Sequence, residues 1–255
     1  MKFRAVIRDS ISIRDFFNII TTLSKCGKDF IFHALPDRLV VSVNTDSPHT
    51  ALPMWCDLDK ERFFAEYHME GLSQTHNGII LLMNSSSLLR GLSVSRQTTY
   101  FVKLKLMNKN MACLCVEMEV PSSEAVKNRS ISHDVPVTVV SKRDWKHYEL
   151  PKLPHFGMVL GMPNIRVISN IIENMKSSSP VMSVRTAKEG TVSFISESPM
   201  AKISCHCREQ EVVSQGEDEE VICRIESKRL ALFLLSSQFL SSAMRCSISA
   251  GHLVR

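Results

Sequence analysis

The sequence repeats one local pattern four times: a strand-like run of residues followed at once by an amphipathic helix. The four units are Lys2–Arg8 with Ser12–Lys28, Gly78–Met83 with Ser85–Gln97, His155–Met162 with Asn164–Ser177, and Glu220–Glu226 with Ser227–Phe239. Each helix opens with Ser or Asn, whose side-chain oxygen can accept from the free amides of a first turn. Short strand-like segments, Arg62–Met69 among them, fill the intervals. The pattern predicts an α+β fold of two similar domains, each itself doubled.

The helix predicted at Ser12–Lys28 has two faces of different character. The apolar face holds Ile13, Phe16, Phe17, Ile20 and Leu23, and a second stripe holds Arg14, Asn18, Thr21, Lys25 and Lys28. The second stripe contains no carboxylate. An apolar face toward the core and an acid-free basic face outward suit a polyanion that is bound without reading its sequence.

Composition limits the classes of protein that fit. The chain has 255 residues, 44% of them hydrophobic, and a net charge of +5, so it can bury a sizeable core but is not a strongly basic domain. A nucleic-acid surface would therefore need charge segregated onto one face. The apolar runs fall far short of the roughly 20 residues that span a bilayer, and the start lacks the apolar core of a secretory signal. We expect no membrane partner, and eight reduced cysteines.

Two Cys-x-Cys pairs are candidate metal ligands, Cys113 with Cys115 and Cys205 with Cys207. Alternation along a strand places both sulfur atoms of a pair on one face. The spacing of one residue is shorter than the usual spacing within a zinc ligand pair. We therefore favour core thiols and predict no metal site.

Catalytic chemistry finds little support in the sequence. His133 next to Asp134 resembles part of a catalytic pair, but no nucleophile motif accompanies it, and a pair at a strand edge is the preferred reading. Asp57, Asp59 and Glu61 alternate as two-metal nuclease carboxylates could, although Lys60 and Arg62 interleave with them. Phosphate-binding and dinucleotide-binding glycine loops are absent. We predict no enzyme activity and no cofactor, with a metal-dependent nuclease as the less favoured alternative.

Several segments resemble, in matching order, the Hus-type subunit of the heterotrimeric DNA-damage checkpoint clamp, the nine-one-one complex. They are Met1–Ala5, Met54–Leu58, Phe63–Gly71, His133–Val137, Trp145 and Ile172–Lys176. The resemblance is dense up to about Lys176 and thinner beyond it. It implies a clamp fold like that of proliferating cell nuclear antigen, in which two similar domains place helices on the inner wall of a ring and antiparallel sheets outside.

Mapped by this resemblance, domain one covers residues 1–140, the interdomain connector 141–154, and domain two 155–255. Pro151 and Pro154 favour an extended connector. After the fourth helix the chain offers one strand, Met244–Ser249, and a turn at Ala250-Gly251. We therefore expect that domain two lacks its last strands, which would weaken both that domain and its joint with domain one.

The resemblance also implies a function and its residues. It implies a non-enzymatic ring subunit, loaded on DNA at damage sites by a clamp loader, that serves as a scaffold for checkpoint signalling and repair. Its partners would be two different clamp-like subunits, double-stranded DNA through the ring, and repair and checkpoint proteins at the connector. We expect it in the nucleus, with a cytoplasmic pool. A homotrimeric replicative clamp is the alternative within the same fold.

The predicted site residues fall into two groups. The DNA-facing residues are Arg14, Lys25, Lys28, Arg90, Arg96 and Arg166. The subunit interfaces are the strands Ile131–Val140 and Met200–Cys207, with Ile131, His133, Val135, Val137, Val139, Met200, Ile203 and Cys205 as contact residues. Unpaired backbone groups on two sheet edges would need a neighbouring chain.

Overall fold

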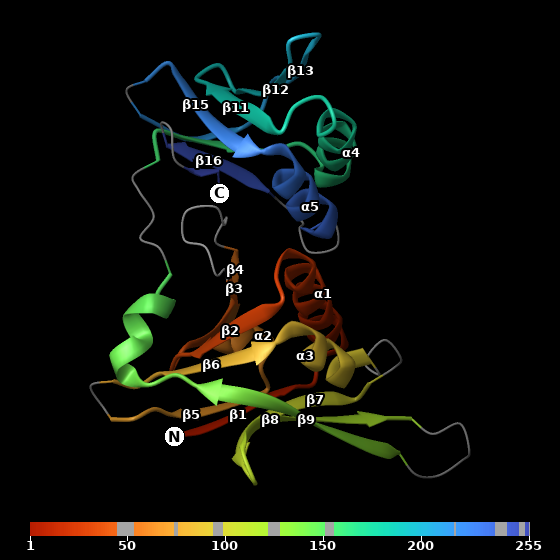
Figure 1. Ribbon diagram of the computed structural model, residues 1–255, viewed down its shortest axis with the longest axis vertical. Helices are drawn as coiled ribbons and strands as arrows, with labels where there is room; N and C mark the ends of the chain where they lie inside the picture. The colour runs from red at the N-terminus through yellow and green to blue at the C-terminus, as the bar shows by residue number, and fades with distance from the viewer. Residues whose placement is uncertain are drawn as a thin grey trace. The chain divides into compact units, whose positions relative to one another are not determined.

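The computed structural model describes residues 1–44, 54–73, 76–93, 99–121, 128–150, 156–216, 218–237, 244–249 and 253–254. The chain divides into two compact units, Met1–Pro151 and Lys152–Arg255 (Figure 1). None of the helices among the described residues is both long and apolar enough to cross a membrane.

The first unit is built on one antiparallel sheet with the strand order β4-β3-β2-β6-β9-β8-β7-β1-β5. Its strands are β1 (Lys2–Ile7), β2 (Asp29–Ala34), β3 (Arg38–Asn44), β4 (Trp55–Asp59), β5 (Glu66–Glu70), β6 (Ile79–Asn84), β7 (Phe101–Asn108), β8 (Ala112–Val120) and β9 (Arg129–Val139). Its helices are α1 (Ser10–Cys26), α2 (Lys60–Phe63), α3 (Ser85–Leu92) and the 3-10 helix η2 (Lys142–Tyr148). The long strand β9 joins the two halves of the sheet, because its first part pairs with β8 and its last part with β6.

The second unit repeats the strand-pairing pattern of the first, but in two separate sheets of four strands each. Its elements are β10 (Met158–Gly161), α4 (Ile165–Met175), β11 (Val181–Ala187), β12 (Thr191–Glu197), β13 (Lys202–Cys207), β14 (Val212–Gln215), β15 (Glu220–Glu226), α5 (Ser227–Ser237), β16 (Arg245–Ser249) and β17 (Leu253–Val254). Strand β10 pairs with β14 and β16 as β1 pairs with β5 and β7, and β11 pairs with β12 and β15 as β2 pairs with β3 and β6. The predicted duplication, with a strand leading into each of α1, α3, α4 and α5, is confirmed.

Helix α1 begins and ends at recognisable signals. The carboxylate of Asp9 accepts a hydrogen bond from the amide of Ser12 at 2.9 Å, and the amide of Gly27 donates to the carbonyl of Leu23 at the other end. A capping carboxylate of this kind stabilises a helix by about 1 kcal/mol. The helix therefore stops before Lys28, two residues earlier than predicted.

The buried face of α1 is wider than the predicted stripe. Ile13, Phe16, Ile20 and Leu23 are buried as expected, but Phe17 is only half-buried. Ile19 and Thr22 are buried instead. Helix α1 contacts α3 as well as strands β3 and β7, so its covered surface extends beyond one stripe.

Two local predictions were wrong. The strand expected at Arg62–Met69 begins only at Glu66, since the carboxylate of Asp59 accepts from the amides of Glu61 and Arg62 and starts the short helix α2. The connector begins with the 3-10 helix η2 and not with extended chain.

Packing explains why the connector opens as a helix. It places Trp145 and Tyr148 against Ile31, Ile80 and Val140, and the Nε1 of Trp145 donates to the carbonyl of Val140 at 3.2 Å. Both aromatic side chains thus reach the same apolar surface of unit 1. Pro151 and Pro154 lie outside the described residues.

The last strands of unit 2 are partly as predicted. Strand β16 matches the predicted Met244–Ser249, and it pairs with β17. The turn predicted at residues 250 and 251 lies outside the described part of the chain. A counterpart of β9 is not found among the described residues of unit 2.

Candidate nucleic-acid wall and subunit edges

The basic residues predicted on α1 are exposed, but the stripe has a carboxylate beside it. Arg14 has a 69% exposed side chain, and its Nε lies 3.8 Å from the Oδ1 of Asp15. A pair this long and this exposed contributes between zero and about 1 kcal/mol, so Arg14 remains available to another anion. Lys25 is exposed in the last turn of α1, where the helix dipole favours a positive charge.

Lys28 lies beyond the end of α1 and helps to join it to α3. Its carbonyl accepts from the backbone amide of Ser85 at 2.8 Å and from the side-chain amide of Asn84 at 3.3 Å. Asn84 in turn caps α3 by accepting from the amides of Ser86 and Ser87. These bonds hold the start of α3 against the end of α1, and the two helices pack together.

The other predicted DNA-facing residues are distributed over two units. Arg90 is exposed in the last turn of α3, while Arg96 lies outside the described residues. Arg166 is exposed in the first turn of α4, in unit 2. The structure thus brings Arg14, Lys25 and Arg90 onto one pair of packed helices.

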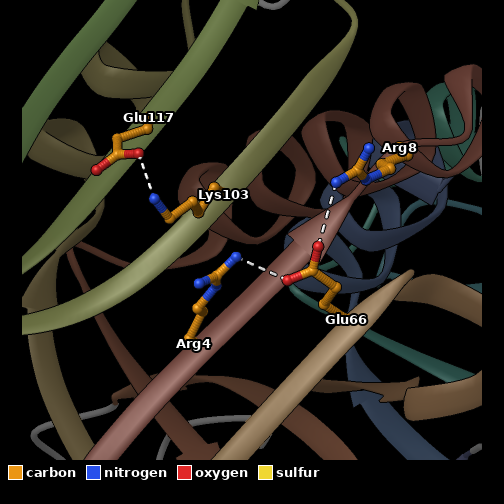
Figure 2. A network of polar contacts seen from close by, with 5 residues as sticks. All are labelled: Arg4, Arg8, Glu66, Lys103 and Glu117. Atoms are coloured by element: carbon orange, nitrogen blue, oxygen red, sulfur yellow. Dashed lines mark hydrogen bonds and ion pairs between the residues drawn. The ribbon is translucent and has the colours of Figure 1, made fainter.

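Cations on and next to the sheet of unit 1 form close ion pairs with carboxylates (Figure 2). Glu66 of β5 accepts from Arg4 at 2.7 Å and from Arg8 at 3.1 Å. The pKa of Glu66 is lowered, mainly by the hydrogen bond from Arg8 and further by the positive charges of Arg4 and Arg8. Lys103 of β7 lies 2.6 Å from Glu117 of β8, and the hydrogen bond from Lys103 lowers the pKa of Glu117.

The two helices differ from the sheet in this respect. Among the described residues, Lys25 and Arg90 have no such carboxylate partner. On these two helices Lys25 and Arg90 thus lack an acid partner and Arg14 has only the long pair with Asp15, whereas the cations of Figure 2 are closely paired with Glu66 and Glu117.

The two predicted interface strands both leave backbone groups unpaired. Among the described residues, β9 pairs only with β8 from Arg129 to Pro136, and β13 is the last strand of its sheet and pairs only with β12. The end of β9 differs from the prediction, because Val137 and Val139 pair with β6 and so belong to the interior of the sheet.

Most of the side chains predicted as interface contacts face their own unit. Val135 is buried, Ile131, His133, Val137, Val139 and Cys205 are half-buried, and Ile203 and Met200 are exposed. The ring of His133 lies so close to α3 that a Cβ at Gly91 would meet it at 2.8 Å. At these edges the backbone, more than the side chains, is what a neighbouring chain could use.

The alternative chemical sites find no geometric support. Asp59 caps α2, and no group of three or more His, Cys, Asp and Glu side chains that could hold a metal exists among the described residues. Strand alternation separates His133 from Asp134, whose Oδ2 accepts from the Nζ of Lys109 at 2.5 Å. This hydrogen bond is the main reason that the pKa of Asp134 is lowered.

The cysteines behave as small apolar residues. Cys113 and Cys115 are buried in β8, and Cys205 and Cys207 pack partly buried against the core of unit 2. Burial raises the pKa of Cys115, and burial together with the neighbouring Cys205 raises that of Cys207 to about 11. The raised pKa values of Cys115 and Cys207 favour their protonated thiols, whereas a metal ligand is a thiolate.

Comparisons with known proteins agree with this architecture. The family model described as "Hus1-like protein" matches residues 1–255. The chain is 29% identical over 257 residues to the "Checkpoint protein Hus1-like" of Drosophila melanogaster, an alignment that covers 100% of this chain and 92% of the relative. It is 27% identical over 263 residues to the human "Checkpoint protein HUS1", with coverages of 100% and 93%.

A solved structure supports the fold independently. The crystal structure of PCNA from Thermococcus kodakaraensis superposes with a TM-score of 0.68 and 15% sequence identity, over 98% of this chain and 90% of that one. The duplicated topology is thus that of a sliding clamp. With the family match extending over its whole length, the chain belongs to the Hus1-like family of checkpoint proteins.

Proposed function

We propose that the chain is a non-enzymatic subunit of a ring-shaped checkpoint clamp that encircles duplex DNA and serves as a scaffold for damage signalling and repair. The observation that carries this proposal is the duplicated clamp fold, in which each unit has a pair of packed helices and one candidate edge strand. The family match supports the checkpoint role. A nuclear location follows from that role.

The mechanism we propose is topological. A closed ring holds DNA by linkage, so its inner wall needs only weak phosphate contacts and the ring can slide. Three exposed cations provide such contacts: Arg14 and Lys25 on α1, and Arg90 on α3. Among the described residues, Lys25 and Arg90 have no carboxylate partner that would compete with a phosphate. Long cationic side chains neutralise phosphates without reading bases.

The ring closes through two different neighbours in this proposal. The unpaired edges of β9 and β13 belong to different units, and each accepts one strand of another clamp-like subunit. A clamp loader opens the ring on DNA, and repair and checkpoint proteins bind at the connector.

Retention on circular DNA tests the topological mechanism. The chain, assembled with two other clamp subunits, is loaded by a clamp loader onto a nicked circular duplex and washed at high salt. We expect the ring to stay on the circle and to leave within minutes after a restriction enzyme linearises it. Equal retention on circular and linear DNA would show that binding, and not linkage, holds the protein.

Amide hydrogen exchange tests the two edges. Ring assembly should slow exchange in β9 between Arg129 and Asp134 and in β13 between Lys202 and Cys207. Strand β5 is the terminal strand of the sheet that contains β9. It serves as the matched control, because we assign no neighbouring subunit to it. Protection of β5 in place of β13 would refute the assignment of the edges.

A further inference from the structure

Equivalent sheet faces have different surroundings in the two units. The face is formed by β2 and β6 in unit 1 and by β11 and β15 in unit 2. In unit 1, Leu82 of β6 pairs with Ile31 of β2, and Ile80 pairs with His33. In unit 2 the equivalent cross-strand pairs are Arg224 with Ser183, and Ile222 with Arg185. The register of the repeated strands therefore aligns these positions one by one.

The face in unit 1 is already occupied by a segment of the chain. The 3-10 helix η2 lies on it, and Trp145 and Tyr148 cover Ile31 and Ile80, which are 7% and 1% exposed. The unit thus shows that this sheet face accepts a short segment anchored by an aromatic residue.

The equivalent face in unit 2 is open. Ile222, the counterpart of Ile80, is 48% exposed, and Arg224, the counterpart of Leu82, is also exposed. The opposite face of the same strands is filled by Met182, Val184 and Cys223, which pack in the core of unit 2 with α4 and α5. The open face therefore points away from the helices.

The residues on the open face suit a phosphate group. Arg185 and Arg224 are diagonal neighbours on adjacent strands, a separation of about 7–8 Å that long side chains can bridge. Ser183 lies directly opposite Arg224 and adds a hydroxyl donor. Arg185 also binds Glu220, but a guanidinium has five N–H donors and can serve a carboxylate and a phosphate together. Arg224 has no ion pair with any described residue.

The surrounding acids favour one phosphate over a nucleic-acid backbone. Glu220 and Glu226 lie at the two ends of β15, and Glu197 lies near Lys202 at the edge of the sheet. A run of phosphates crossing the sheet would approach all three carboxylates, whereas a single phosphate between the two arginines would approach mainly Glu220, which is already paired with Arg185.

We propose that this face of β11 and β15 binds a phosphorylated peptide, with its phosphate between Arg185 and Arg224 and an aromatic side chain of the peptide on Ile222. Paired arginines recognise phosphate bidentately in this way. The peptide would lie on unit 2 as η2 lies on unit 1, with the charge of Arg224 selecting the phosphorylated form. The site lies on the face of β11 and β15 that is opposite α4 and α5.

Fluorescence polarisation with the full chain tests the proposal. The probes are three labelled decapeptides with one central phosphoserine and a tryptophan two, three or four residues away, each with its serine counterpart. At least one phosphopeptide should bind about tenfold or more tightly than its serine form. Arg224→Glu and Arg185→Glu should each remove most of that difference.

The control is Arg245→Glu, which makes the same charge change on β16, in the other sheet of unit 2. It should leave phosphopeptide affinity unchanged, and circular dichroism and the unfolding midpoint should show that all variants fold. The proposal is overturned if no phosphopeptide binds, if the serine forms bind equally, or if Arg245→Glu has the same effect. It is also overturned if a short DNA duplex displaces the peptide and loses affinity in the same variants.

Discussion

Replacing Arg14 and Lys25 by alanine should weaken the association of the assembled ring with DNA without changing its dependence on sequence. The two residues are eleven positions apart on α1, or about 16 Å along the helix axis. That distance covers several phosphates of one strand. Each lost phosphate contact lowers the slope of log affinity against log salt by about 0.9, so the double variant should lose up to about 1.8.

This change in slope corresponds to a measurable difference in affinity. Over a fourfold rise in salt, from about 50 to about 200 mM, the native ring should lose about twelvefold more affinity than the double variant. The fold should survive, because both side chains are exposed and lie off the buried face of α1. The assay is fluorescence anisotropy on duplexes of unrelated sequence across a salt series.

A matched control separates the helix face from general charge. Arg4→Ala with Lys105→Ala also removes two cations from unit 1, but these face each other across β1 and β7 on the sheet. That variant should keep the native slope. An unchanged slope in the α1 variant, or an equal drop in the control, would refute the orientation of unit 1 toward DNA.

Three further predictions concern stability. Gly190→Ala should lower the free energy of unfolding by about 1–3 kcal/mol in thermal melts, because Gly190 has φ +78 and a Cβ there would lie 2.4 Å from a backbone carbonyl of Gln210; an unchanged midpoint would contradict this. Burial raises the pKa of Tyr67 above its usual 10, so stability should fall more steeply above about pH 10 in the native protein than in Tyr67→Phe. That variant should also lose about 1–3 kcal/mol at pH 7, because the Tyr67 hydroxyl donates to the carbonyls of Leu35 and Arg38. A parallel decline in both proteins would remove Tyr67 as the cause. Trp145→Ala should lower the free energy of unfolding by about 2 kcal/mol and speed limited proteolysis in the connector, since the Trp145 ring anchors η2. Cleavage at the native rate would show that η2 stays packed without this ring.

The sequence predicts the repeated architecture well because each repeat has a local pattern of apolar spacing and capping residues. Each of α1, α3, α4 and α5 buries an apolar stripe that recurs at helical spacing, and capping residues such as Asn84 and Asn164 mark where two of the helices start. Strand pairing then follows from the duplication. These signals depend on neighbouring residues and so can be read without tertiary contacts.

The errors arise where distant contacts decide. Helix η2 forms in the connector because Trp145 reaches Ile31 and Ile80, more than sixty residues earlier in the chain. Strand β9 changes partner after Pro136, which no local pattern encodes. The basic stripe of α1 contains no carboxylate in the sequence pattern, but the adjacent Asp15 approaches Arg14 in the structure.

The open sheet face of unit 2 shows a different limit of sequence reasoning. Arg185 and Arg224 are far apart in the sequence and lie on strands whose periodicity looks ordinary. Only the register of β11 with β15 brings them together, and the exposure of Ile222 and Arg224 shows that no described segment covers the face.

The mass of the purified protein, alone and with two other clamp subunits, tests the central claim most directly. Light scattering coupled to size exclusion should give the mass of one chain, 28.8 kDa, for the protein alone. With both other subunits present it should give one complex that contains a single copy of each. A stable trimer of this chain alone, or failure to enter a complex with both subunits, would contradict its role as one part of a heteromeric ring.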